Sequence, residues 1–114
     1  MRALAVFLFL AVSVHSAVAG DWRYCLAPSH AQGKVYLSMP FPAGVVEGDP
    51  ESEFGRMLQR SGKAYDDVQC PRAGDERAAL VMRRQAIDYN HEAGNAIVRL
   101  NWTRSEERRV GKEC

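Results

Sequence analysis

The chain contains the segment Trp22-Arg23-Tyr24-Cys25-Leu26, in which large apolar residues alternate with polar or small ones. A period of two is typical of a β-strand with one buried face. The segment also carries a cysteine, and Cys70 is the only other cysteine between residues 20 and 103. A strand that is also cross-linked would be a fixed point against which the other segments can be placed.

Residues 1–19 have the pattern of an export signal. Arg2 supplies a positive charge, residues 3–14 are almost entirely apolar, and residues 17–19 form a small-x-small cleavage site. We therefore expect a mature protein that begins near Gly20 and is located in the periplasm or secreted. The apolar stretch is shorter than the roughly 20 residues that span a bilayer, so we expect no integral membrane association.

Residues 104–114, with the sequence RSEERRVGKEC, resemble the in-frame translation of a sequencing-library adapter. A natural, solvated charged tail is the alternative interpretation. We expect residues 20–103 to form a single small disulfide-stapled domain, and we expect Cys114 to lie outside it. On this interpretation Thr103 need not be the natural end of the protein.

The charge balance argues against a nucleic-acid partner. The whole chain of 114 residues has a formal net charge of +1, but residues 20–103 contain ten basic and eleven acidic residues. A nearly neutral domain creates no field that attracts a polyanion. A domain of this size has a small core, so a covalent cross-link would add substantially to its stability.

A disulfide is the simplest use of Cys25 and Cys70 in an exported domain. Closing a loop of about 45 residues stabilises a protein by roughly 4 kcal/mol in the chain-entropy model. A redox site is disfavoured because there is no C-x-x-C motif, and a metal site would need more ligands at close spacing. We expect no metal and no cofactor.

The N-terminal half is predicted to contain a hairpin and a helix. A turn at residues 28–33 separates the first strand from a second strand at residues 35–41. Asp49 can cap a helix that has Pro50 at its first position, and Gly62 can end it. On one side of the second strand lie Val35, Leu37, Met39 and Phe41, and the core face of the helix carries Phe54, Met57 and Leu58.

The C-terminal half is predicted to contain two strands around a longer helix. A short third strand at residues 65–70 ends before Pro71, and a fourth strand covers residues 96–102. Between them, Asp75 is the expected cap of a helix that ends near Ala93. The apolar arc of this helix consists of Ala78, Ala79, Met82, Ala86, Tyr89 and Ala93.

These elements predict an α+β fold: a small two-layer sandwich in the order ββαβαβ, with two helices on one face of a four-stranded sheet. The residues resemble those of small secreted hypothetical proteins of alphaproteobacteria. The resemblance rests on five segments and on the helix from Met82 to Asn90, and the segments are Trp22-Arg23-Tyr24-Cys25, Lys34-Val35-Tyr36, Phe54-Gly55-Arg56-Met57-Leu58, Val68-Gln69-Cys70-Pro71 and Asn101-Trp102. It implies a shared fold and disulfide, and it implies no activity.

The best candidate for a functional surface is the side of the sheet away from the helices. Tyr36 falls on the opposite face from Val35 and Leu37, so we expect it on an open face, with Arg23 and Arg99 as further contact residues. The alternative is that Tyr36 covers the disulfide or flanks a neighbouring strand. The expected function is a non-catalytic binding or interaction module for an unknown protein, peptide or glycan.

A small extracytoplasmic hydrolase is the alternative function. His30 and His91 are the only histidines beyond the export signal, and they lie in a predicted turn and near a helix end. Catalysis would need a cleft that joins one of them to an acid or a hydroxyl group. Without such a cleft, both are expected to be solvated surface residues, and no catalytic residue is assigned.

Overall fold

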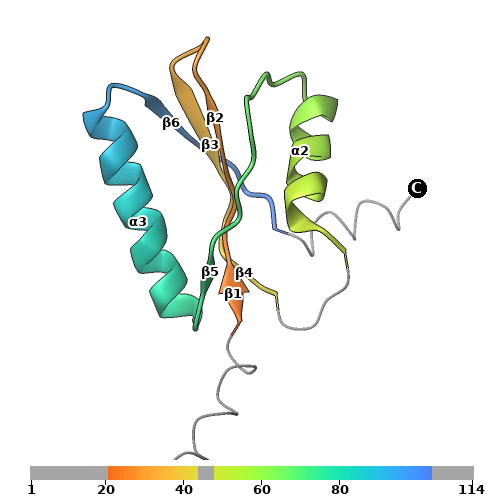
Figure 1. Cartoon of the computed structure of the whole chain (residues 1–114), viewed down its shortest axis with the longest axis vertical. Coiled ribbons are helices and arrows are strands. Elements are labelled where there is room, and N and C mark those ends of the chain that lie inside the picture. The colour runs from red at the N-terminus through yellow and green to blue at the C-terminus, as the bar shows by residue number, and fades with distance from the viewer. Residues whose placement is uncertain (1–20, 44–47, 104–114) are drawn as a thin grey trace, which may run out of the picture.

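The computed structural model describes residues 21–43 and 48–103 (Figure 1). The predicted export signal and residues 104–114 lie outside this part of the chain. The helices are α2 (Pro50–Arg60) and α3 (Glu76–Glu92). The strands are β1 (Trp22–Arg23), β2 (Leu26–Ser29), β3 (Lys34–Leu37), β4 (Phe41–Pro42), β5 (Arg72–Ala73) and β6 (Ala96–Arg99).

The strands form two small sheets instead of the expected single four-stranded one. The first sheet has the order β4-β1-β5 and is antiparallel, and the second has the order β2-β3-β6. In the second sheet β2 and β3 form an antiparallel hairpin, but Pro28 and Ser29, which the sequence predicts in the turn, belong to β2. The predicted first strand is divided, because β1 lies in the other sheet. Strands β3 and β6 run parallel, with Val35 opposite Ile97. The fold is therefore mixed α+β, as predicted, with a different sheet arrangement.

The division between the sheets has a local cause. The N–H of Cys25 donates to the side-chain Oγ of Ser38 at 2.8 Å, so a side chain takes the place of a ladder carbonyl. Two residues further on, Pro40 has no N–H to donate. The alternation of side chains between the two faces also changes here. Val35 and Leu37 pack in one core and Phe41 packs in another, although the sequence predicts all three on one side.

The two helices lie on opposite sides of the strands, which corrects the expectation that they share one face (Figure 1). Each helix covers its own core. The α2-side core contains Cys25, Ala27, Tyr36, Phe41, Phe54, Leu58, Cys70 and Trp102. The α3-side core contains Tyr24, Val35, Leu37 and Ile87.

The helices lie on opposite sides because β3, the central strand of the second sheet, is apolar on both faces. Successive side chains of a strand point to opposite faces. Val35 and Leu37 therefore face α3 while Tyr36 faces α2, and all three are at most 2% exposed. A sheet with two apolar faces requires a covering layer on each side. The two-layer prediction was wrong because it left the Tyr36 face open.

Both helices begin as the sequence predicts. The side chain of Asp49 accepts a hydrogen bond from the N–H of Glu51, with Pro50 in the first turn, and Asp75 accepts from the N–H of Ala78. Such caps satisfy amide groups that have no partner inside the helix. After α3, Gly94 adopts a φ of +88°, a conformation that glycine reaches without strain.

The predicted third strand is wrong. Residues 65–70 touch β2 at two points: the N–H of Asp66 donates to Pro28, and Gln69 and Leu26 exchange backbone hydrogen bonds. Between these two points, Asp67 and Val68 lie opposite the single residue Ala27, which prevents a regular ladder. The strand in this region is β5, which begins after Pro71 instead of ending before it.

The predicted disulfide between Cys25 and Cys70 is present. Cys25 lies between β1 and β2, and Cys70 lies between the Gln69 bridge and β5. Both residues are buried in the α2-side core together with Phe54. The cross-link therefore joins the segments where the two sheets meet.

Candidate functional site

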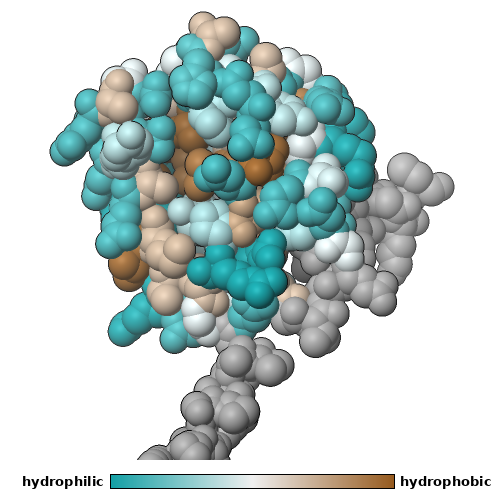
Figure 2. All heavy atoms as spheres, in the orientation of Figure 1, coloured by the Kyte–Doolittle hydropathy of each residue, from teal (hydrophilic) through white to brown (hydrophobic). Residues whose placement is uncertain are grey.

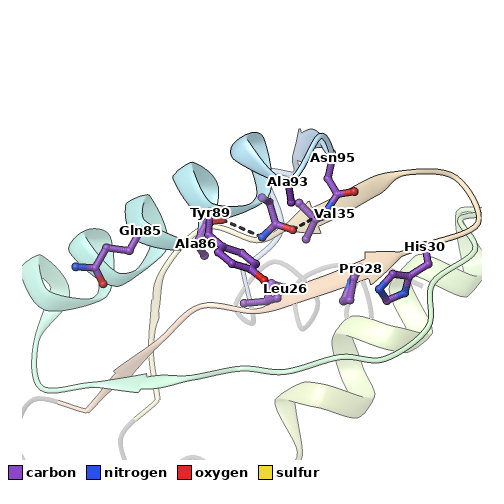
Figure 3. Close-up of a pocket in the computed structure, with 10 residues that line it drawn as sticks. Leu26, Pro28, His30, Val35, Gln85, Ala86, Tyr89, Ala93 and Asn95 are labelled. Atoms are coloured by element: carbon purple, nitrogen blue, oxygen red, sulfur yellow. Dashed lines mark hydrogen bonds between the residues drawn. The ribbon is translucent and has the colours of Figure 1, made fainter.

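An open groove of about 660 Å³ lies between α3 and the β2–β3 hairpin. Its strand wall consists of Leu26, Pro28 and Val35, and its helix wall includes Ala86, Tyr89 and Ala93 (Figure 3). We refer to it as the α3–β2 groove. Apolar surface is also visible over the strands between the two helices, surrounded by hydrophilic residues (Figure 2).

Tyr89 is the most exposed large apolar side chain among the described residues, at 73%. It extends from α3 toward the strand wall (Figure 3). The sequence placed Tyr89 on the core arc of the helix, and this was wrong. The residues of α3 that are buried are Ala79 and Ile87, so the core face is rotated away from Tyr89. The ring is therefore available for contact with a ligand.

Amide side chains line the part of the groove next to the end of α3. The Nδ2 of Asn90 donates to the carbonyl of Ala86 at 2.9 Å, and the Nδ2 of Asn95 donates to the Oδ1 of Asn90 at 3.0 Å (Figure 3). These bonds fix the orientation of both amides. None of the described residues that line the groove is an Asp, Glu, Lys or Arg.

His30 lines the hairpin end of the groove and contacts a carboxylate. Its backbone N–H donates to the Oδ2 of Asp66 at 2.8 Å, and its ring Nδ1 lies 2.5 Å from the same oxygen. These two hydrogen bonds, the backbone one first, hold the pKa of Asp66 below its usual value. The ring is 82% exposed. The sequence did not predict this pair, because the two residues are 36 positions apart.

The other histidine has a different environment. His91 is exposed in the last turn of α3, where a positive charge complements the helix dipole. Within residues 21–43 and 48–103, the structure brings His30 but not His91 to a carboxylate. In the same part of the chain, no three His, Cys, Asp or Glu side chains group together as metal ligands.

The three candidate contact residues do not form one surface. Tyr36 is only 2% exposed and lies in the α2-side core, which also contains the disulfide. The Arg23 side chain is 16% exposed and its Nη1 lies 3.6 Å from Glu51. Arg99 lies on β6, in the other sheet. The expectation of an open sheet face is therefore wrong, because α2 covers it.

Arg99 instead belongs to a second hollow, of about 280 Å³, between α3 and β6. We call it the arginine hollow, and it is lined by Leu80, Arg83, Arg84, Ile87 and Arg99. The Nε of Arg83 donates to the carbonyl of Ser38 at 2.8 Å. Burial, and then the neighbouring Arg99, lower the pKa of Arg83.

Comparisons of the chain with protein-family models, with curated proteins and with solved structures find no match. Within the described part of the chain, no helix has the length and apolar character needed to cross a bilayer.

Proposed function

We propose that this chain is an extracytoplasmic, non-catalytic binding module whose α3–β2 groove holds an uncharged, apolar segment of a peptide. The observation that carries the proposal is the groove itself. Its volume of about 660 Å³ falls within the usual range for ligand pockets, roughly 300–1,000 Å³. Apolar walls with a few oriented polar groups are typical of such pockets.

The chemistry of the lining favours a peptide as the occupant. Tyr89 offers a large, exposed aromatic ring, a residue type that often supplies binding energy at interfaces. Asn90 and Asn95 have fixed amide groups, and an amide can both donate to and accept from a peptide backbone. The lining has no permanent charge to pair with a charged ligand. An apolar side chain flanked by peptide groups fits these three properties.

The test is selection of random peptides on the purified domain, followed by calorimetry of the enriched sequences. Tyr89→Ala removes the ring and Ala93→Trp fills the groove, and each should weaken binding about tenfold or more. Val81→Ser is the matched control, because Val81 is 52% exposed on α3 but does not line the groove. Circular dichroism checks that every variant is folded.

Failure to enrich any peptide, or equal binding by all three variants, would contradict the proposal. A glycan that binds the wild type and not Tyr89→Ala would keep the groove as the site but replace the peptide with a sugar. The control matters because it separates the groove from a general apolar attraction to α3.

A hydrolase that uses His30 is the second candidate function. The contact between His30 and Asp66 favours it, since a carboxylate on Nδ1 orients an imidazole for proton transfer. A structural role also accounts for this contact. The carboxylate of Asp66 accepts a hydrogen bond from the backbone N–H of His30, and the backbone N–H of Asp66 donates to the carbonyl of Pro28. These two bonds hold residues 65–70 against the hairpin. Among the described groove residues there is no Ser, Thr or Cys nucleophile. Hydrolysis of chromogenic esters that is lost in His30→Asn would establish the enzyme and overturn the non-catalytic proposal.

A further inference from the structure

The arginine hollow brings together cationic groups from two distant parts of the sequence. Arg83 and Arg84 are on α3, and Arg99 is on β6, which packs against that helix. The placement of Arg99 follows from strand alternation. Ile97 packs against the α3-side core, so Arg99, two positions later on the same strand, points to the same face.

One of these arginines is held in position. The Nε of Arg83 donates to the carbonyl of Ser38 at 2.8 Å, across 45 residues of sequence. A guanidinium group has five N–H donors in a rigid planar fork, so this bond leaves its terminal NH₂ groups available. The side chain is also partly buried, and the bond to Ser38 limits its motion. The donors facing the hollow are thus oriented before a ligand arrives.

The positive charges of the hollow are only partly balanced within the described part of the chain. None of the residues lining it is acidic. Asp88 lies 4.0 Å from Arg84, but both side chains are about two-thirds exposed, and such surface pairs contribute little. The lowered pKa of Arg83 has the proximity of Arg99 as its second cause, after burial. An anion placed between these groups would relieve their repulsion.

The remaining lining defines the rest of the ligand. Leu80, which is 45% exposed, and Ile87 provide an apolar surface beside the guanidinium groups. A volume of about 280 Å³ lies at the low end for ligand pockets and suits a small acid or the end group of a longer molecule. A guanidinium group can donate two parallel hydrogen bonds to two oxygens of the same carboxylate, phosphate or sulfate group.

We propose that the arginine hollow is a binding site for the oxyanion group of a small organic acid whose apolar part rests on Leu80 and Ile87. Arg83 and Arg99 bind the oxyanion from the helix and from the strand, and Arg84 adds charge at the rim. This site is separate from the α3–β2 groove and does not depend on the function proposed for it, because the two hollows lie on opposite flanks of α3 and share no lining residue.

The test uses probes that share one apolar group and differ in the anion: benzoate, phenyl phosphate and phenyl sulfate, with neutral benzamide as the reference. Binding is followed by NMR, from the side-chain Nε–H signals of the arginines, and by calorimetry. We expect at least one anion to bind with a Kd of about 1 mM or lower, a realistic value for so small a ligand. The order of the three probes identifies whether the natural anion is a carboxylate, a phosphate or a sulfate.

Two variants locate the site. Arg99→Gln removes a charge from the hollow and should weaken anion binding about tenfold. Arg56→Gln makes the same change in net charge on the exposed side of α2, beyond the other face of the strands, and should leave binding unchanged. Because Arg83 also holds Ser38, Arg83→Gln is informative only when its melting curve matches that of the wild type.

Three outcomes would overturn the proposal. The first is the absence of any shift with all three anions. The second is an equal loss in Arg99→Gln and Arg56→Gln, which would indicate attraction by net charge alone. The third is benzamide binding as tightly as the anions, which would make the hollow a purely apolar site.

Discussion

Loss of the Cys25–Cys70 disulfide is expected to remove about 4 kcal/mol from the free energy of unfolding. The cysteines are 45 residues apart, and closing a loop of that length reduces the entropy of the unfolded chain by this amount. Small domains have total stabilities of roughly 5–15 kcal/mol, so the cross-link would account for a large share. The melting temperature should fall by roughly 15–30 °C, since about 1 kcal/mol corresponds to 4–8 °C in a domain of this size.

The buried position of the cross-link decides how this estimate should be tested. Cys25 is fully buried and Cys70 is 6% exposed, both against Phe54 and Leu58, so replacing them with alanine would also remove buried atoms. Reduction of the native bond avoids that problem. The experiment compares oxidised and reduced protein in a Cys114→Ser background, so that only one cysteine pair is involved.

Urea unfolding followed by tryptophan fluorescence measures both states. Trp102 is buried in the α2-side core, so its emission reports the loss of that core. The double variant Cys25→Ala/Cys70→Ala should be less stable than the reduced protein by the additional cost of lost packing. Equal urea midpoints for oxidised and reduced protein would refute the reasoning, as would free thiols at both positions in non-reduced material.

Three further outcomes are expected. Tyr36→Ser should lower the free energy of unfolding by about 3–5 kcal/mol because the ring is buried. Tyr36→Phe should lower it by under about 1 kcal/mol, since the hydroxyl group makes only a 3.5 Å contact with Gln32. Equal denaturation midpoints for the two variants would contradict this expectation. Burial raises the pKa of Tyr24, so its contribution to stability is complete below about pH 10 and is lost as the pH rises through the pKa of the folded state. Absorbance at 295 nm should show that Tyr24 ionises at a higher pH than an exposed tyrosine. Tyr24→Phe should lose less stability than the wild type at alkaline pH. Hydrogen bonds from His30 lower the pKa of Asp66. The contribution of Asp66 to stability is therefore present above the usual aspartate pKa of about 3.9 and is lost as the pH falls through the lowered pKa of the folded state. An NMR titration in which the carboxyl group of Asp66 has the usual aspartate pKa would contradict this expectation.

The local structure was predictable because its causes are local. The caps at Asp49 and Asp75 depend on side chains that reach amides two or three residues away. The hairpin depends on a turn of a few residues, and the disulfide on the presence of a single cysteine pair between residues 20 and 103. Each of these features can be inferred from a short window of sequence or from a count of cysteines.

The arrangement of the layers was not predictable in the same way. Both helices have one apolar side, which is equally consistent with packing on the same face or on opposite faces of a sheet. The deciding fact is that Val35 and Tyr36 both need cover, and a tyrosine at a strand position is compatible with an exposed or a buried face.

The candidate sites depend on contacts between segments that are far apart in the sequence. His30 meets Asp66 only because residues 65–70 run beside β2. Arg99 joins Arg83 only because β6 lies next to α3. A sequence window contains neither pair. The one local signal was the Arg83-Arg84 doublet in the middle of a helix, and its meaning depends on what the helix packs against.

The parallel pairing of β3 with β6 has a consequence for biosynthesis. The central strand of the second sheet is made early, but its partner is the last strand of the described chain and follows it by about 60 residues. Contacts between such distant segments form slowly, because a long loop must close before they contribute. Until β6 and α3 are present and in place, one apolar side of the hairpin has no cover. A polypeptide that terminates before Glu76 should therefore self-associate instead of remaining as a smaller folded unit.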